Sequence, residues 1–268
     1  MNDPIVWEPL IRVAAFSIVI AVLGTGESRA PRRARRRLSE TLPNIGLFAT
    51  DTLVLRLVSV TSLAGVAALT NAEGWGLLHA MHAPAWLETT VTVVVLDLCV
   101  YLQHRALHWV PWFWRLHAVH HCDVEFDVTT GIRFHLGEAL LSFAIKLGVV
   151  VVLGASVWAV IIFEALLSAA SLFTHANWRL PSGVDKALRL VLVTPDMHRV
   201  HHSVAEDEHN RNFGFLLSWW DRWFDTYREQ PREGHEVMPV GLSVYRAPGE
   251  RTFWALLRQP FAPYPASQ

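Results

Sequence analysis

The longest apolar stretch of the chain runs from Ala139 to Thr174, and the small residues Gly154-Ala155-Ser156 break it near its middle. A helix needs roughly 20 residues to cross the hydrocarbon core of a membrane, so a run of about 36 residues is too long for one crossing. We therefore predict a helical hairpin whose arms of about 16 residues each span about 24 Å. Both ends of such a hairpin must leave the membrane on the same side.

Three further apolar segments precede the hairpin, at Ile5 to Leu23, Ile45 to Thr70 and Ala85 to Gln103. Each is close to the length of one crossing. The first is followed by a cluster of basic residues, namely Arg29, Arg32, Arg33, Arg35, Arg36 and Arg37. Positive charge marks cytoplasmic loops, so residues 29–37 are expected in the cytoplasm. The third crossing then delivers residue 104 to that same side.

These segments predict an all-α fold: an integral-membrane helical bundle of about three crossings plus a helical hairpin, with a cytoplasmic His-rich catalytic cap. We expect residues 1–89 to form the N-terminal membrane helices and the basic loop, 90–235 the catalytic region, and 236–268 an irregular C-terminal tail. The expected location is a bacterial inner membrane. Ionisable residues inside a membrane face the bundle interior or pair, and we predict that Lys146 pairs with Glu164 because they lie equally far from the hairpin tip.

Histidines are concentrated in three boxes: His104-Arg-Ala-Leu-His108, His117-Ala-Val-His120-His121 and His198-Arg-Val-His201-His202. Residues three or four apart share one face of a helix, so each box can aim its imidazoles at a common point. Thr194 followed by Pro195 is typical of a helix start just before the third box. Eight convergent imidazoles are enough for two metal ions, and metal binding is the favoured interpretation.

Other histidines are interpreted from their position. We expect His175, at the return end of the hairpin, to bind metal. His135 stands at the entrance of the hairpin, where ligation and a hydrogen bond that organises the entrance are equally open. Four others are interpreted as non-ligands, because they lie on the opposite side of the membrane or lack partners at helical spacing: His79, His82, His209 and His235.

The ligand type limits the metal and its chemistry. Imidazole suits iron, copper, zinc and nickel, whereas magnesium and calcium prefer oxygen, and structural zinc rarely uses histidine alone. Two adjacent irons can activate dioxygen for hydrogen abstraction from an unactivated carbon. Carboxylates that can accept a ring N–H, or else cap helices or face solvent, are Asp196, Glu138 and Asp123. Two cysteines, Cys99 and Cys122, are too few for a disulfide framework or an iron–sulfur cluster.

The ordered motifs resemble the fatty acid hydroxylase/sterol desaturase superfamily over roughly residues 90–230. The resemblance rests on HRALH, WRLHAVHH, DVTTGIRFH and GE between Tyr101 and Glu138, and on FTHANW at 173–178, TPDMHRVHHS at 194–203 and NRNFGFLLSWWDRWFDTY at 210–227. It implies a membrane oxygenase with two iron ions that uses O2. The implied metal ligands are His104, His108, His117, His120, His121, His198, His201 and His202, with His175 as a ninth. Some branches carry a further histidine where this chain has Arg179.

The resemblance implies that a lipid from the bilayer, sterol-like, fatty acyl or ether-linked, is hydroxylated or desaturated, and the sequence leaves the choice open. Electrons are expected from an external ferredoxin- or cytochrome-type protein. Four arginines are either its docking surface or an ordinary solvated surface: Arg199, Arg211, Arg222 and Arg228. The groups Trp109-Trp112-Trp114 and Trp219-Trp220-Trp223 are expected at the membrane–water boundary. The net charge of −1 argues against a nucleic-acid partner.

Two other functions agree less well with the sequence. A transition-metal transporter needs ligands near the midplane of the membrane, whereas these histidines lie at and beyond helix ends. A zinc-dependent membrane hydrolase needs a general-base carboxylate, but the chain lacks an HExxH motif. Zinc remains a possible substitute metal in purified preparations, because affinity orders do not preserve the physiological metal.

Overall fold

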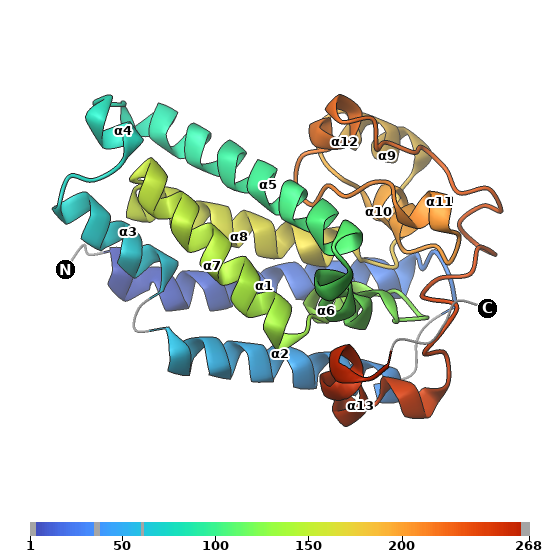
Figure 1. The fold of residues 1–268 in the computed structure, drawn as a ribbon. Helices are drawn as coiled ribbons and strands as arrows, with labels where there is room; N and C mark the ends of the chain where they lie inside the picture. The colour runs from blue at the N-terminus through green and yellow to red at the C-terminus, as the bar shows by residue number, and fades with distance from the viewer. Residues whose placement is uncertain (1–3, 35–37, 60–61, 264–268) are drawn as a thin grey trace.

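The computed structural model describes residues 4–34, 38–59 and 62–263, and places the long helices side by side with the short cap helices at one end (Figure 1). The long bundle helices are α1 (Pro4–Arg29), α2 (Leu38–Val58), α3 (Leu63–Ala72), α5 (Ala85–Trp109), α7 (Leu136–Leu153) and α8 (Val157–Thr174). The short helix α4 (Leu77–Ala80) lies at the end of the bundle away from the cap. Among the described residues there is no β-strand, only isolated bridges such as Pro31 with Trp178.

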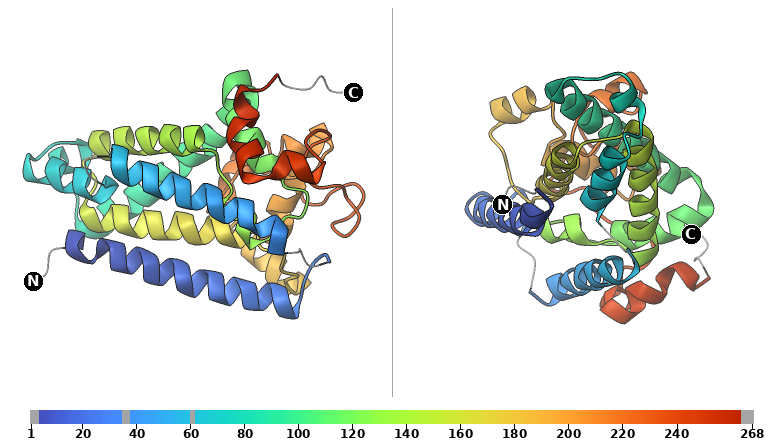
Figure 2. Two further views of the ribbon diagram at one scale, coloured as in Figure 1. Left: turned by 90° about the horizontal axis from the view of Figure 1, so that it is seen from below. Right: turned by 90° about the vertical axis from the view of Figure 1, so that its left-hand side faces the viewer.

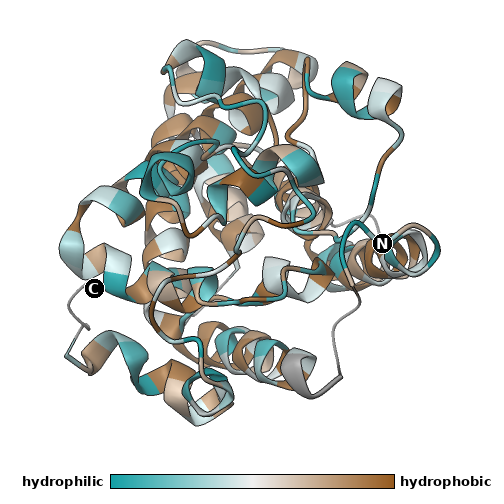
Figure 3. Ribbon diagram, turned by 90° about the vertical axis from the view of Figure 1, so that its right-hand side faces the viewer, coloured by the Kyte–Doolittle hydropathy of each residue, from teal (hydrophilic) through white to brown (hydrophobic). Residues whose placement is uncertain are grey.

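The cap consists of short helices joined by irregular segments. They are α6 (Pro111–His121), η1 (Val128–Ile132), α9 (Ser182–Leu188), α10 (Pro195–His201), α11 (Glu206–His209), α12 (Trp219–Trp223), η2 (Pro248–Arg251), α13 (Phe253–Arg258) and η3 (Gln259–Phe261). Viewed from this end, the cap mixes hydrophilic and hydrophobic residues (Figure 3).

The predicted hairpin is confirmed. Helices α7 and α8 have 18 residues each, or about 27 Å of helix at about 1.5 Å per residue. Gly154 ends α7 with a φ of 65°, a left-handed conformation that glycine adopts without strain. A Cβ at this position would lie 2.2 Å from the carbonyl oxygen of Trp75. Asn71 donates a hydrogen bond to the Ala155 carbonyl at 3.1 Å, so the tip is held by the chain around α3 and α4.

Five apolar helical stretches among the described residues are long enough to cross a membrane, which agrees with three crossings plus a hairpin. Only 6% of the apolar window of α1 is buried, and its exposed residues include Val6, Leu10 and Val13. Two boundaries differ from the prediction. The third crossing continues through the first histidine box to Trp109, and the second consists of two helices, α2 and α3, with residues 60–61 outside the described part.

The ion pair of Glu164 within the bundle differs from the predicted one. Arg12 on α1 contacts Glu164 on α8 at 2.7 Å and Glu8 at 3.1 Å. The direct partner of Glu164 is therefore Arg12 instead of Lys146, although Lys146 lies close enough to interact with the charge of Glu164. The reason is the packing of α1 against α8, which places a third charged residue at this depth.

The chain after Gly234 is more ordered than the predicted irregular tail. Helix α13 packs against α2, where Leu47 and Leu256 are fully buried in one apolar cluster with Phe253 at its edge. Gly46 permits this approach, because a Cβ there would lie 2.9 Å from the Phe253 ring. Figure 2 shows α13 lying across the cap end of α2.

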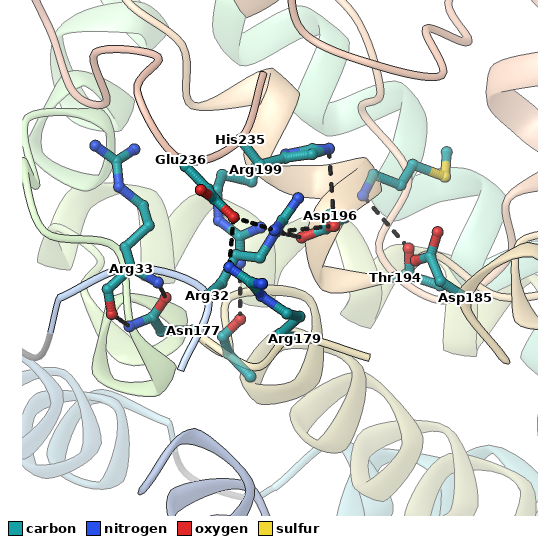
Figure 4. A network of polar contacts seen from close by, with 12 residues as sticks. Arg32, Arg33, Asn177, Arg179, Asp185, Thr194, Asp196, Arg199, His235 and Glu236 are labelled. Carbon is teal, nitrogen blue, oxygen red and sulfur yellow. Dashed lines mark hydrogen bonds and ion pairs between the residues drawn. The ribbon is translucent and has the colours of Figure 1, made fainter. Parts of the chain in front are cut away.

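Part of the basic cluster ties the N-terminal arm to the cap (Figure 4). Arg32 contacts Asp196 and Glu236, each at 3.2 Å, and Glu236 also pairs with Arg179. Arg33 donates to the Met238 carbonyl at 2.8 Å. Residues 35–37 of the predicted cluster lie outside the described residues.

Candidate metal centre

Four segments deliver imidazoles to one place at the cap end of the bundle. The last turns of α5 carry His104 and His108, and α6 carries the second box. His175 caps the C-terminus of α8. Helix α10 starts as predicted, because Thr194 accepts a hydrogen bond from the Met197 N–H at 3.3 Å and Pro195 occupies its first turn.

The nine histidines form two neighbouring groups. The five-histidine group contains His104, His108, His117, His121 and His201, and the four-histidine group contains His120, His175, His198 and His202. Within each group the candidate ligand atoms lie within 4.8 Å of one another. The groups adjoin, since the rings of His121 and His202 stack at 4.4 Å. Both the second and the third box divide their histidines between the two groups.

Hydrogen bonds determine which nitrogen is available in the five-histidine group. The Nδ1 of His104 lies 2.7 Å from the Phe213 carbonyl, and the Nδ1 of His117 lies 2.9 Å from Glu138. The Phe213 carbonyl requires a proton on the Nδ1 of His104, and an ionised Glu138 requires one on the Nδ1 of His117, so in each such neutral ring Nε2 carries only a lone pair. These two Nε2 atoms face each other at 3.0 Å, which is unfavourable unless a cation lies between them.

The four-histidine group repeats the same arrangement. The Nδ1 of His120 lies 3.1 Å from the Arg133 carbonyl, and the Nδ1 of His175 lies 2.7 Å from the Ser171 carbonyl. Their Nε2 atoms are 3.0 Å apart, and the Nε2 of His175 is 3.2 Å from that of His202. Two nitrogens at adjacent positions on one ion, each bound at about 2.1 Å, are about 3 Å apart. The observed separations therefore fit shared metal ions.

The remaining nitrogens and the protonation states agree with metal binding. Buried ring nitrogens of His121, His198 and His202 have no hydrogen-bond partner among the described residues, which is costly unless an ion satisfies them. Burial lowers the pKa of His117 to about 3 and that of His175 to about 4. These imidazoles are thus neutral near pH 7, and the neutral ring is the form that binds metals.

Several groups that orient the ligands were missed from the sequence, because they are backbone carbonyls. They belong to Arg133, Ser171, Arg211 and Phe213. Asp221 holds the loop that carries two of them, since it accepts hydrogen bonds from the N–H groups of Phe213 at 2.8 Å and Gly214 at 2.9 Å. Burial raises the pKa of Asp221 to about 6. Glu138 was the one predicted acceptor that contacts a ring of the centre.

The other predicted acceptors lie elsewhere. Asp196 pairs with Arg199 and Arg32, and its nearest histidine contact is with His235 at 3.8 Å, outside both groups. Asp123 accepts hydrogen bonds from Thr130 at 2.8 Å and from Asn44 at 3.3 Å. Neither carboxylate belongs to one of the two histidine groups.

His135 organises the hairpin entrance, which was one of its two open roles. Its Nδ1 accepts from the Gly137 N–H at 3.0 Å and caps α7, and its Nε2 lies 3.2 Å from the Leu257 carbonyl. With both nitrogens engaged, His135 belongs to neither group. His209 differs from its predicted isolation, because its ring lies 4.7 Å from His108 and 4.6 Å from His121.

The predicted docking arginines do not form one exposed surface. Arg199 is fully buried, pairs with Asp196 and lies over the Phe126 ring. Arg228 pairs with Asp207 at 2.9 Å. The tryptophan groups divide similarly: Trp112 and Trp223 are exposed, whereas Trp220 is buried and donates to Asp97 of α5 at 2.7 Å.

Comparison with known proteins gives one family and several relatives. The model of the fatty acid hydroxylase family matches residues 89–226. Ornithine lipid hydroxylase OlsE of Rhizobium tropici is 31% identical over 179 residues, which cover 67% of this chain and 52% of the relative. Alkylglycerol monooxygenase of Danio rerio is 29% identical over 156 residues, covering 57% of this chain and 34% of the relative. The chain thus matches about half of the length of the first relative and a third of the second. No solved structure gives a significant match.

Proposed function

The chain belongs to the fatty acid hydroxylase family, and from this premise we propose that it is a membrane-embedded di-iron oxygenase that hydroxylates a lipid. The resemblance found in the sequence is thereby confirmed. One observation carries the proposal: paired Nε2 lone pairs face each other at 3.0 Å in each of two adjacent histidine groups. The reaction consumes one O2, two electrons and two protons, and converts a C–H bond into C–OH with release of water.

The ligand assignment follows the two groups. One iron would be held by the five-histidine group and the other by the four-histidine group. An iron pair supplies the activation of dioxygen and the abstraction of hydrogen from carbon. The protein holds each ring in the ligating tautomer through Glu138 and the carbonyls of the cap, and its buried histidines exclude bulk water from the centre.

Access from the bilayer favours a lipid substrate. Phe215 lies between the bundle core and the histidines, since it belongs to the apolar cluster of α5, α7 and α8 and its ring lies 5.1 Å from that of His104. An acyl or alkyl chain that entered between the helices would meet the centre at Phe215, on its apolar side. The relatives act, by their names, on ornithine lipids and alkylglycerols. We propose a polar membrane lipid of this general kind, with hydroxylation favoured over desaturation.

The remaining assignments concern location and electrons. The helices that carry the boxes, α5, α6 and α10, meet at one end of the bundle. Arg32 and Arg33 contact the cap at that end, so the positive-inside rule favours a cytoplasmic centre, and we propose a bacterial inner membrane. A ferredoxin- or cytochrome-type protein would supply the electrons there.

The test is anaerobic purification of the full chain, loading with iron-57, and Mössbauer spectroscopy together with metal quantification. We expect two coupled irons per chain, and a hydroxylated lipid in cells that express the protein but not in cells that express His120→Ala or His201→Ala. His82→Ala, at the opposite end of the bundle, is the matched control and should behave as wild type. One tightly bound zinc, without iron uptake or O2 consumption, would instead support a hydrolase or transporter.

A further inference from the structure

His209 packs onto the five-histidine group from outside both groups. It is the last residue of α11, a short helix that follows the third box. Its ring centroid lies 4.6 Å from His121, 4.7 Å from His108 and 4.9 Å from Trp114. It is also parallel to His201, with 6.0 Å between the centroids. These spacings match those inside the group, such as 4.8 Å between His108 and His121.

The two histidine rings nearest to His209, those of His108 and His121, differ from the other rings of the group in how they are held. His104, His117 and His201 each have an Nδ1 held by a carbonyl or a carboxylate. His121 has no hydrogen-bond partner on either nitrogen among the described residues, and His108 interacts through its nitrogens only with the side chain of Asn210, the residue after His209. Ring packing, to which His209 and Trp114 both contribute, therefore restrains these two rings more than hydrogen bonding does.

Ion pairs hold α11 in this position. Arg228 contacts Asp207 at 2.9 Å and Glu208 at 3.0 Å, and Arg232 pairs with Asp207 and donates its backbone N–H to Glu208 at 2.6 Å. The position of His209 against the centre thus depends on ion pairs between α11 and the segment that contains Arg228 and Arg232.

The surface beside α11 is open to water. A surface pocket is lined by residues on either side of His209 in the chain, including Asp207 and Asn210, and by Arg105 of α5. His209 itself is partly buried. His209 is thus the partly exposed ring that packs against a group of which His117, His121 and His201 are fully buried.

We propose that His209 is the solvent-side cover of the five-histidine group and controls how fast the metal ion in that group exchanges. The proposal rests on the di-iron function above. His209 acts by filling space against His108 and His121, so an aromatic ring of similar size can replace it. Its role is confined to one ion, because its ring contacts are with members of the five-histidine group and with Trp114.

The experiment measures iron release from the anaerobic, ferrous full-length protein after addition of the chelator ferrozine. Wild type should release both irons slowly. His209→Ala should release one of its two irons at least about tenfold faster, on the scale of effects seen when groups supporting a metal ligand are removed, while the second iron leaves at the wild-type rate. His209→Phe should restore slow release. His82→Ala is the matched control.

Each outcome decides the matter. Equal release from His209→Ala and wild type would overturn the proposal and leave the di-iron function intact, whereas absence of iron from wild type would overturn the function itself. Fast iron release from both His209→Phe and His209→Ala would overturn the proposal, because it would show that the imidazole nitrogen binds the metal and that the ring does not act by filling space. In a His198→Ala background, in which the four-histidine group is impaired, the single remaining iron should still leave faster with His209→Ala.

Discussion

Replacing Glu138 by Gln tests how the protein orients one ligand. The carboxylate lies 2.9 Å from the Nδ1 of His117, and both side chains are buried. Bound metal ions would keep Glu138 ionised through their positive charge. A hydrogen bond to a charged group contributes about 1.5–3 kcal/mol, which corresponds to about 10- to 100-fold in an equilibrium constant. In Glu138→Gln the amide oxygen is a weaker acceptor. The amide NH2, if turned towards the ring, moves the proton to Nε2 and blocks the atom that faces His104.

We therefore expect Glu138→Gln to weaken one of two iron sites by about 10- to 100-fold, as removal of a ligand's hydrogen-bond partner does elsewhere. The four-histidine group should keep its affinity for iron, because Glu138 contacts His117, which belongs to the five-histidine group. The assay is anaerobic Fe(II) titration against a competing chelator, with Mössbauer spectra at each stoichiometry. Glu233→Gln, on the exposed surface, is the control. Wild-type affinity at both sites, or equal weakening of both, would refute the reasoning.

Three further outcomes are expected from the same structure. Asp221→Asn should lower the free energy of unfolding by about 1–3 kcal/mol, because the amide replaces one of the two buried oxygens that accept the Phe213 and Gly214 N–H groups. Thermal unfolding in detergent measures the change, and an unchanged midpoint would contradict the prediction. Gly154→Ala should cost at least about 1 kcal/mol, since the residue has a φ of 65° and its Cβ would lie 2.2 Å from the Trp75 carbonyl oxygen; a wild-type melting temperature would show that the tip rearranges. Metal-free protein should lose stability as the pH falls below about 6.5. In the unfolded chain the histidines bind protons in this range, whereas His117 and His175, with folded-state pKa values of about 3 and 4, do not. Each such histidine contributes about 1.4 kcal/mol per pH unit to the loss, and a free energy of unfolding that stays constant between pH 7 and 5 would exclude it.

The sequence predicted those parts of the fold that depend on interactions between residues close together in the chain. The break at Gly154 and the start of α10 at Pro195 depend on backbone conformation and capping within a few residues, so they could be predicted accurately. The pairing of Glu164 could not, because it depends on α1 lying against α8, and hydropathy does not encode which helices become neighbours. Arg199 was misread for a similar reason: its burial follows from Asp196 and the Phe126 ring, which the sequence does not place beside it.

The candidate site shows the same division. Helical spacing was sufficient to collect the imidazoles of each box, since residues three and four apart share a face. It did not predict how the boxes divide between two groups, which depends on the relative orientation of α5, α6 and α10. His209 was set aside for lack of helical partners, and its neighbours His108 and His121 come from other helices. The carbonyls of Phe213 and Ser171 carry no side-chain signature at all.

The way the boxes divide between the groups has a consequence for how such a protein can change over generations. His117 and His121 belong to one group while His120 belongs to the other, and the third box is divided in the same way. A single inserted or deleted residue inside either box turns the following imidazoles by about 100° around the helix and so disturbs both ion sites together. Neither metal site is encoded by a separate sequence motif. An insertion or deletion inside one of these boxes therefore affects both metal sites, whereas a single substitution can impair one site alone.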